Sequence, residues 1–85
     1  MDLAMPKNAF KDNPLTSEYE EKAKNILKGE LKRRGLTYAE LVERLGKIGV
    51  SETERNIANK ISRGGFSAAF FIQCLQAMGA DSLRL

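Results

Sequence analysis

Residues 36–64, LTYAELVERLGKIGVSETERNIANKISRG, predict two amphipathic helices joined by a turn. Thr37 and Glu40 have the spacing of a capping box, in which the hydroxyl and the carboxylate each accept a backbone N–H. Leu36 and Leu41 are spaced as a hydrophobic staple across that helix start. The first helix is therefore expected at about 38–48, ended by Gly49 or, earlier, by Gly46. Its expected apolar stripe is Tyr38, Leu41, Val42, Leu45 and Ile48.

The second helix of this pair is expected at about 52–63. Ser51 and Glu54 have the capping-box spacing, and Gly64 with Gly65 supplies the stop. Its apolar stripe is narrow, since only Ile57, Ala58 and Ile61 share one side. Most of its circumference is polar and is expected to face outward, with Arg55, Asn56, Asn59, Lys60 and Arg63.

The same signals place one helix on each side of this pair. Ser17 and Glu20 form another capping box, which predicts a helix over 18–34 that ends at Gly35. Its expected apolar stripe is Tyr19, Ala23, Ile26, Leu27 and Leu31. Ser67 caps a helix over 68–78, with Phe66 and Phe71 as its staple, and the apolar content predicts a buried central helix. No β-type alternation competes, so the fold is expected to be all-α: a compact bundle of four to five helices.

Length and composition suit one small domain. The chain has 85 residues, of which 42% are hydrophobic and 29% charged, as in an ordinary globular protein. Residues 1–16 contain two prolines and no clear period, and they are expected to form a flexible N-terminal arm. Residues 17–85 are expected to form a single bundle.

The net charge of +3 is unevenly distributed. Residues 1–21 sum to −3, whereas residues 22–34 sum to +5. A local basic segment favours a polyanionic partner, although cations near a helix C-terminus also occur on ordinary solvated faces.

The residue types argue against catalysis. The chain has no His and one cysteine, Cys74, which lies in the most apolar helix, where a thiol is usually inert. We therefore expect no enzyme activity, no metal and no cofactor. No signal peptide or membrane span is evident, and the apolar side of 22–34 is too narrow for a membrane-surface helix, so a cytoplasmic protein is expected.

The order of these helices, caps and glycine stops resembles that of the lambda-repressor-like (Xre-type) helix-turn-helix family. The matching residues are Leu36, Thr37, Glu40, Leu41, Leu45, Gly46, Val50, Ser51, Ile61, Arg63, Gly64, Ser67, Leu75 and Gly79. The resemblance implies a helix-turn-helix within the bundle, double-stranded DNA as partner, and 52–63 as the helix in the major groove. The family passes almost directly from LG to VS, whereas Lys47, Ile48 and Gly49 intervene here, so the second and third helices are expected to be longer than usual.

Polar side chains at these positions suit DNA contacts. The candidates for reading base edges are Thr53, Arg55, Asn56, Asn59 and Lys60. The candidates for phosphate contacts are Lys32, Arg33, Arg34, Thr37, Tyr38, Arg63 and Ser67. Such a module favours a transcriptional regulator. It is expected to pair as a homodimer, through the fourth helix and the C-terminal residues Leu83 and Leu85 or through the N-terminal arm. The alternative is a protein-interaction or dimerisation bundle of the same fold that does not bind DNA in a sequence-specific way.

Overall fold

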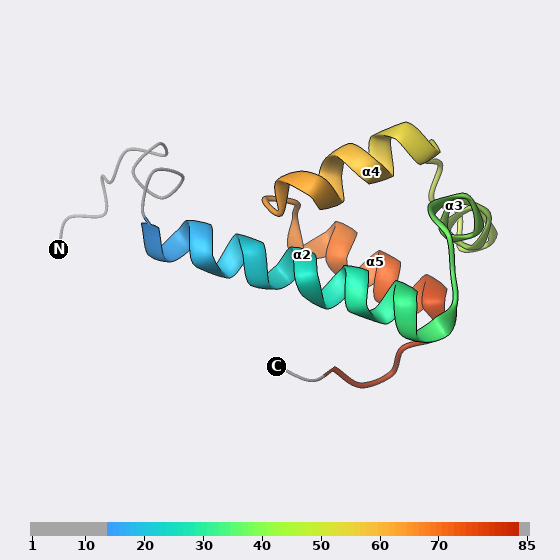
Figure 1. The fold of residues 1–85 in the computed structure, drawn as a ribbon. Helices are drawn as coiled ribbons and strands as arrows, with labels where there is room; N and C mark the ends of the chain where they lie inside the picture. Colours follow the sequence, from blue (N-terminus) through green and yellow to red (C-terminus); the bar gives the residue numbers. More distant parts are fainter. Residues whose placement is uncertain (1–13, 84–85) are drawn as a thin grey trace, which may run out of the picture.

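The first described helix begins earlier than the sequence predicts. The computed structural model describes residues 14–83, and in it α2 spans Pro14–Arg34 (Figure 1). Proline suits the first turn of a helix because it lacks an N–H and its φ is fixed near the helical value. Ser17 therefore lies inside α2, and the predicted Ser17 capping box is wrong. Residues 14–16 of the expected arm are helical, and residues 1–13 lie outside the described part of the chain.

Helix α3, Tyr38–Lys47, begins as predicted. The Glu40 N–H donates to Thr37 Oγ1 at 3.1 Å, and the Thr37 N–H donates to Glu40 Oε1 at 2.8 Å, so the capping box is confirmed. At the other end, Val50 N–H donates to the Leu45 carbonyl at 2.9 Å, and Gly49 has a φ of +86°. This turn directs the chain away from α3.

Helix α4 spans Glu54–Arg63 and is capped by Thr53, not by Ser51. Thr53 Oγ1 accepts the Asn56 N–H at 3.1 Å, whereas the Glu52 carboxylate lies 2.6 Å from Lys60 Nζ. The predicted Ser51 capping box and the start near 52 are therefore wrong. Helices α3 and α4 are shorter than the predicted bounds of 38–48 and 52–63, and residues 48–53 form the connection between them.

Helix α5 spans Ala68–Met78, as predicted, and Ser67 Oγ accepts the Phe70 N–H at 3.0 Å. The expected staple is also present, because the Phe66 and Phe71 rings stack with centroids 5.8 Å apart. The helix is not buried on all sides, however. Phe70 is buried on one stripe of α5 together with Cys74 and Met78, whereas Ile72 is 59% exposed.

The four described helices close a ring around one core. Helix α2 packs against α4 and α5, and α3 packs against the same two helices. Figure 1 shows α3 end-on while α4 runs across the view, so the axes of these consecutive helices cross steeply. The described chain is thus a compact all-α globule of four helices.

The core consists of apolar side chains from all four helices. The buried residues are Leu27, Leu31, Leu41, Leu45, Ile57, Ile61, Phe70, Cys74 and Met78. Two residues expected on the apolar stripes are instead exposed, Tyr19 on α2 and Ile48 after α3. Tyr19 lies near the start of α2, and Ile48 lies in the connection that leaves α3.

Gly64 fixes the position of α4 over α2. Its φ is +73°, and an added Cβ would lie 2.5 Å from the backbone oxygen of Glu20. Only glycine allows this approach together with the left-handed turn. The C-terminal end of α4 therefore rests on the first half of α2.

Candidate nucleic-acid interface

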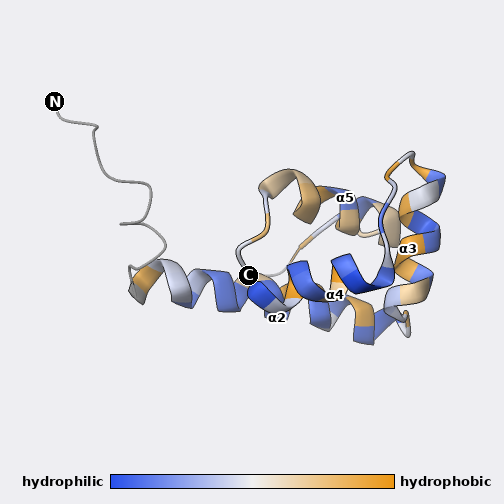
Figure 2. Cartoon of the chain, turned by 90° about the horizontal axis from the view of Figure 1, so that it is seen from above, coloured by the Kyte–Doolittle hydropathy of each residue, from blue (hydrophilic) through white to orange (hydrophobic). Residues whose placement is uncertain are grey.

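The outer face of α4 carries polar and cationic side chains. Ile57 and Ile61 are fully buried, and the positions on the opposite side of the helix are exposed. These outer positions are Arg55, Asn56, Asn59, Ser62 and Arg63. In Figure 2, α4 lies in front of α2, and most of its residues are coloured as hydrophilic.

The side chains of this outer face are available for an external partner. Within residues 14–83, no hydrogen bond or ion pair engages the side chains of Arg55, Asn56, Asn59 or Arg63. Arg55, Asn59 and Arg63 follow one another at intervals of four residues, so they form one line along the helix. Asn56 flanks that line. The predicted base-reading residues Arg55, Asn56 and Asn59 are thus brought together.

The other two predicted base-reading residues have structural roles. Thr53 caps α4 through its hydroxyl oxygen. Lys60 lies over the Phe70 ring, with Nζ 4.9 Å from the ring centroid, and pairs with Glu52 at 2.6 Å. Lys60 therefore points toward the α5 side of α4, and Glu52 is neutralised by it.

A basic hollow forms where α2 passes into α3. It has a volume of about 300 Å³ and is lined by Lys28, Leu31, Lys32, Leu36, Thr37 and Tyr38. Lys28 and Lys32 lie one helical turn apart on α2, both are exposed, and neither has an ion-pair partner in the described chain. The structure thus places the predicted phosphate residues Lys32, Thr37 and Tyr38 around one hollow.

Arg33 and Arg34 are held by an acid on their own helix. Glu30 is only 3% exposed, and its carboxylate accepts from Arg33 Nη2 at 2.5 Å and from Arg34 Nε at 3.2 Å. Arg34 Nη1 also donates to the Met78 carbonyl at 3.2 Å. These contacts compensate the buried charge of Glu30, and they direct Arg34 toward α5 and away from the basic hollow.

Thr37 and Ser67, the N-cap residues among the predicted phosphate contacts, differ in whether their helix start already holds a carboxylate. Thr37 gives both its N–H and its hydroxyl proton to Glu40, so this helix start already holds a carboxylate. The hydrogen bonds from Thr37 lower the pKa of Glu40, which keeps that carboxylate charged. Ser67 is exposed at the start of α5, whose first turn carries no acidic residue.

The predicted phosphate residues are not gathered in one place. Arg63 precedes Gly64, which rests on Glu20 of α2. At the usual helical rise, Lys32 lies about 18 Å further along α2 than Glu20. A duplex that contacts both Arg63 and Lys32 must therefore do so with different phosphates along its backbone.

Sequence reasoning missed two residues of these surfaces. Lys28 lines the basic hollow, and Ser62 belongs to the outer face of α4. The four-residue spacing between Lys28 and Lys32 was the signal for the first, because such neighbours share one side of a helix. Ser62 lies between Ile61 and Arg63 and gave no signal of its own.

The remaining chemistry of the described chain is sparse. Cys74 is fully buried, and burial raises the pKa of its thiol to about 12, with a smaller contribution from Glu52. Among residues 14–83, no group of three or more Cys, Asp or Glu residues is arranged to hold a metal ion. In the same range, no helix has both the length and the apolar character needed to cross a membrane.

Comparison with known proteins identifies a family for this chain but not an activity. Neither the curated proteins nor the solved structures include one that matches it. A family model described as a domain of unknown function, DUF6471, matches residues 19–83, which is most of the chain and covers α2 from residue 19 and the whole of α3, α4 and α5. The chain therefore belongs to the DUF6471 family.

Proposed function

We propose that this protein binds double-stranded DNA and that α4 enters the major groove. The observation that carries the proposal is the outer face of α4, where Arg55, Asn56, Asn59 and Arg63 are exposed without partners in the described chain. Asn side chains pair with adenine edges and Arg side chains with guanine edges. An α-helix with its side chains is about 10–12 Å across, so α4 fits a major groove about 12 Å wide.

The basic hollow supports the same proposal from a second element. Lys28 and Lys32 present two unpaired ammonium groups beside the phenol of Tyr38. Ammonium groups at the edge of a groove-binding helix serve as phosphate contacts, which orient the protein on the duplex without reading sequence. The contact set proposed for phosphates is therefore Lys28, Lys32, Tyr38 and Arg63.

The proposed helix-turn-helix uses α3 and α4 with an enlarged turn. The connection spans residues 48–53, whereas a standard helix-turn-helix turn has about three to four residues. Ile57 and Ile61 still anchor α4 in the core, and the steep crossing of α3 and α4 leaves the opposite side of α4 exposed (Figure 1). The resemblance of the sequence to the lambda-repressor-like helix-turn-helix family is part of this proposal.

A titration of the labelled protein with duplex DNA, followed by NMR, tests the proposal. The largest shift changes are expected in α4 and around residues 28–38. The double variant Asn56→Ala, Asn59→Ala should lose preference among duplexes by about tenfold or more for each base pair it reads, while retaining non-specific binding. Asn25→Ala, on an exposed position of α2, is the matched control. Shift changes confined to other parts of the chain would contradict the proposal.

A competing function is a protein-docking bundle that makes no use of DNA. The hollow beside α5, lined by Ile72, Leu75 and Leu83 among others, favours a protein contact. The two functions differ in their response to salt, because phosphate contacts weaken steeply as salt rises whereas apolar contacts do not. Retention on heparin or duplex DNA at low salt, with release at moderate salt, is the result expected for DNA binding.

A further inference from the structure

A second surface lies on the side of the bundle away from α4. The chain turns at Gly79, whose φ is +81°, and Ala80 N–H donates to the Leu75 carbonyl at 2.9 Å. The residues that follow, 80–83 (here called the tail), run back along the bundle. Figure 1 shows α4 on one side of the layer formed by α2 and α5 and the tail on the other side.

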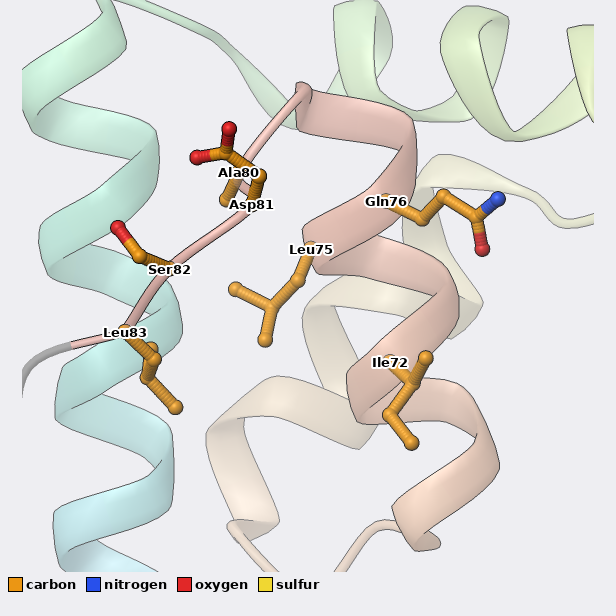
Figure 3. Close-up of a pocket in the computed structure, with 7 residues that line it drawn as sticks. All are labelled: Ile72, Leu75, Gln76, Ala80, Asp81, Ser82 and Leu83. Carbon is orange, nitrogen blue, oxygen red and sulfur yellow. The ribbon is translucent and has the colours of Figure 1, made fainter.

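The tail and α5 enclose a hollow of about 450 Å³ (Figure 3). Leu75 points from α5 toward the tail, and Leu83 closes the far side. Ile72 lies at the rim of the hollow with 59% of its surface exposed. One surface therefore carries both a protruding apolar side chain and an apolar hollow.

The charge of this surface favours a second copy of the chain over a charged partner. No residue of α5 is charged, and among the described residues that line the hollow Asp81 alone is charged. Two copies with a net charge of +3 each repel one another, so they approach most easily where the described lining residues carry no cation. An acidic or basic protein would find almost no opposite charge here to select it.

We propose that two copies pair through this surface, with Ile72 of each copy filling the hollow of the other. A two-fold axis makes such a contact reciprocal, because each copy then supplies the same protrusion and the same hollow. Burial of Ile72 and of the apolar lining in both copies stabilises the pair. The tail is held in place for this contact by the Ala80 hydrogen bond and by Arg34, which donates to the Met78 carbonyl just before the turn.

This pairing determines the direction of the two α4 helices. A two-fold rotation that joins the copies face to face reverses the direction normal to their interface. Since α4 lies on the opposite side from the tail, the two outer faces of α4 point away from each other (Figure 1). A dimer that reads two half-sites of one duplex needs both recognition helices on one side, about 34 Å apart. The pair proposed here instead joins two duplexes, a consequence that rests on the proposed DNA binding.

Sedimentation equilibrium of the full chain without DNA tests the pairing alone. The mass is expected to rise from 9.5 kDa toward twice that value as concentration increases. Ile72→Glu should remain monomeric, because it places a carboxylate in the apolar contact. Ile48→Glu, at an exposed isoleucine after α3, is the matched control and should pair like the unaltered chain. A monomer at every concentration, or equal loss of pairing in both variants, would overturn the proposal; circular dichroism checks that each variant is folded.

A bridging assay tests the orientation. A short duplex fixed to beads is loaded with protein and offered a second, fluorescent duplex of mixed sequence at low salt. The unaltered chain should capture the second duplex, whereas Ile72→Glu should bind the fixed duplex without capturing another. A pair that binds one duplex and captures no second one overturns the orientation. Pairing in the absence of any DNA binding refutes the proposed function and the bridging but leaves the paired interface intact.

Discussion

The guanidinium of Arg34 donates from Nη1 to the carbonyl oxygen of Met78 at 3.2 Å and so joins the C-terminal ends of α2 and α5. The same side chain donates from Nε to Glu30, which is almost completely buried. Arg34 thus satisfies an orphan carbonyl of α5 and compensates a buried carboxylate. An arginine in a basic segment, which the sequence assigns to a phosphate, is used here to hold two helices together.

Arg34→Gln should destabilise the protein without changing DNA affinity per folded molecule. The loss of charge-assisted hydrogen bonds is expected to cost about 2 kcal/mol of unfolding free energy. Urea denaturation measures this cost. Lys32→Gln is the control with the opposite behaviour, since it removes a side chain of the basic hollow that has no ion-pair partner in the described chain. Weaker DNA binding by folded Arg34→Gln would assign the arginine to a phosphate after all.

Gly64→Ala should destabilise the protein far more than Gly35→Ala. Both glycines have positive φ, +73° and +65°, so an alanine at either position costs about 1 kcal/mol in backbone strain. At Gly35 the added Cβ meets open space, whereas at Gly64 it would lie 2.5 Å from the Glu20 oxygen. Relief of that clash requires α4 to move from α2, for a total cost of about 3 kcal/mol. Thermal unfolding of the two variants compares the costs, and equal melting temperatures would show that α4 does not rest on Glu20.

Acid should weaken the start of α3 through Glu40. Hydrogen bonds from the Thr37 N–H and hydroxyl lower the pKa of Glu40 below its ordinary value of 4.5 in the folded chain. A lowered folded pKa contributes stability that is present above pH 4.5 and is lost as the pH falls through the folded pKa. Glu40→Gln should therefore lose less stability than the unaltered chain over this acidic range. Glu43→Gln, on the same helix, is the control, and unfolding curves recorded at several pH values make the comparison.

The salt dependence of DNA binding should reflect the cations that the structure leaves unpaired. Lys28, Lys32, Arg55 and Arg63 have no ion-pair partner among residues 14–83, whereas Arg33 and Arg34 share Glu30. The three cations among the proposed phosphate contacts, Lys28, Lys32 and Arg63, correspond to a log–log slope of about −3. Fluorescence anisotropy at several salt concentrations measures the slope. The double variant Lys28→Gln, Lys32→Gln should reduce its magnitude by about 2.

Local signals in the sequence predicted the helices well and the cap of α4 badly. The capping box of Thr37 with Glu40, the Ser67 cap and the staple of Phe66 with Phe71 all lie at the helix starts, and these predictions are confirmed. Ser51 has an equally good capping-box spacing, yet Glu52 pairs with Lys60, and the helix starts at Glu54 with Thr53 as its N-cap. Ser51–Glu54 and Thr53 are both plausible caps in the local sequence, so spacing alone does not decide between them.

The candidate site shows the same division. The outer position of Asn56 and Asn59 follows from the spacing of Ile57 and Ile61 alone, since a helix that buries one stripe exposes the opposite one. The partner of a long cation does not follow from spacing. Lys60 belongs to the same polar run as Asn59, but its Nζ lies over the Phe70 ring, a residue on a different helix.

The sequence by itself determined the all-α class of this chain, the bounds of α3 and α5 to within a residue, and the polar character of the outer face of α4. These features depend on residues only a few positions apart in the sequence. The pairs of Glu30 with Arg33 and Arg34 follow from spacings of three and four residues within α2. The tertiary structure alone decided which groups the cations meet on other helices. Arg34 donates to the Met78 carbonyl of α5, Lys60 lies over the Phe70 ring of α5, and Lys28 and Lys32 line one hollow with Tyr38 of α3. These groups belong to different helices, so they meet only when those helices pack together.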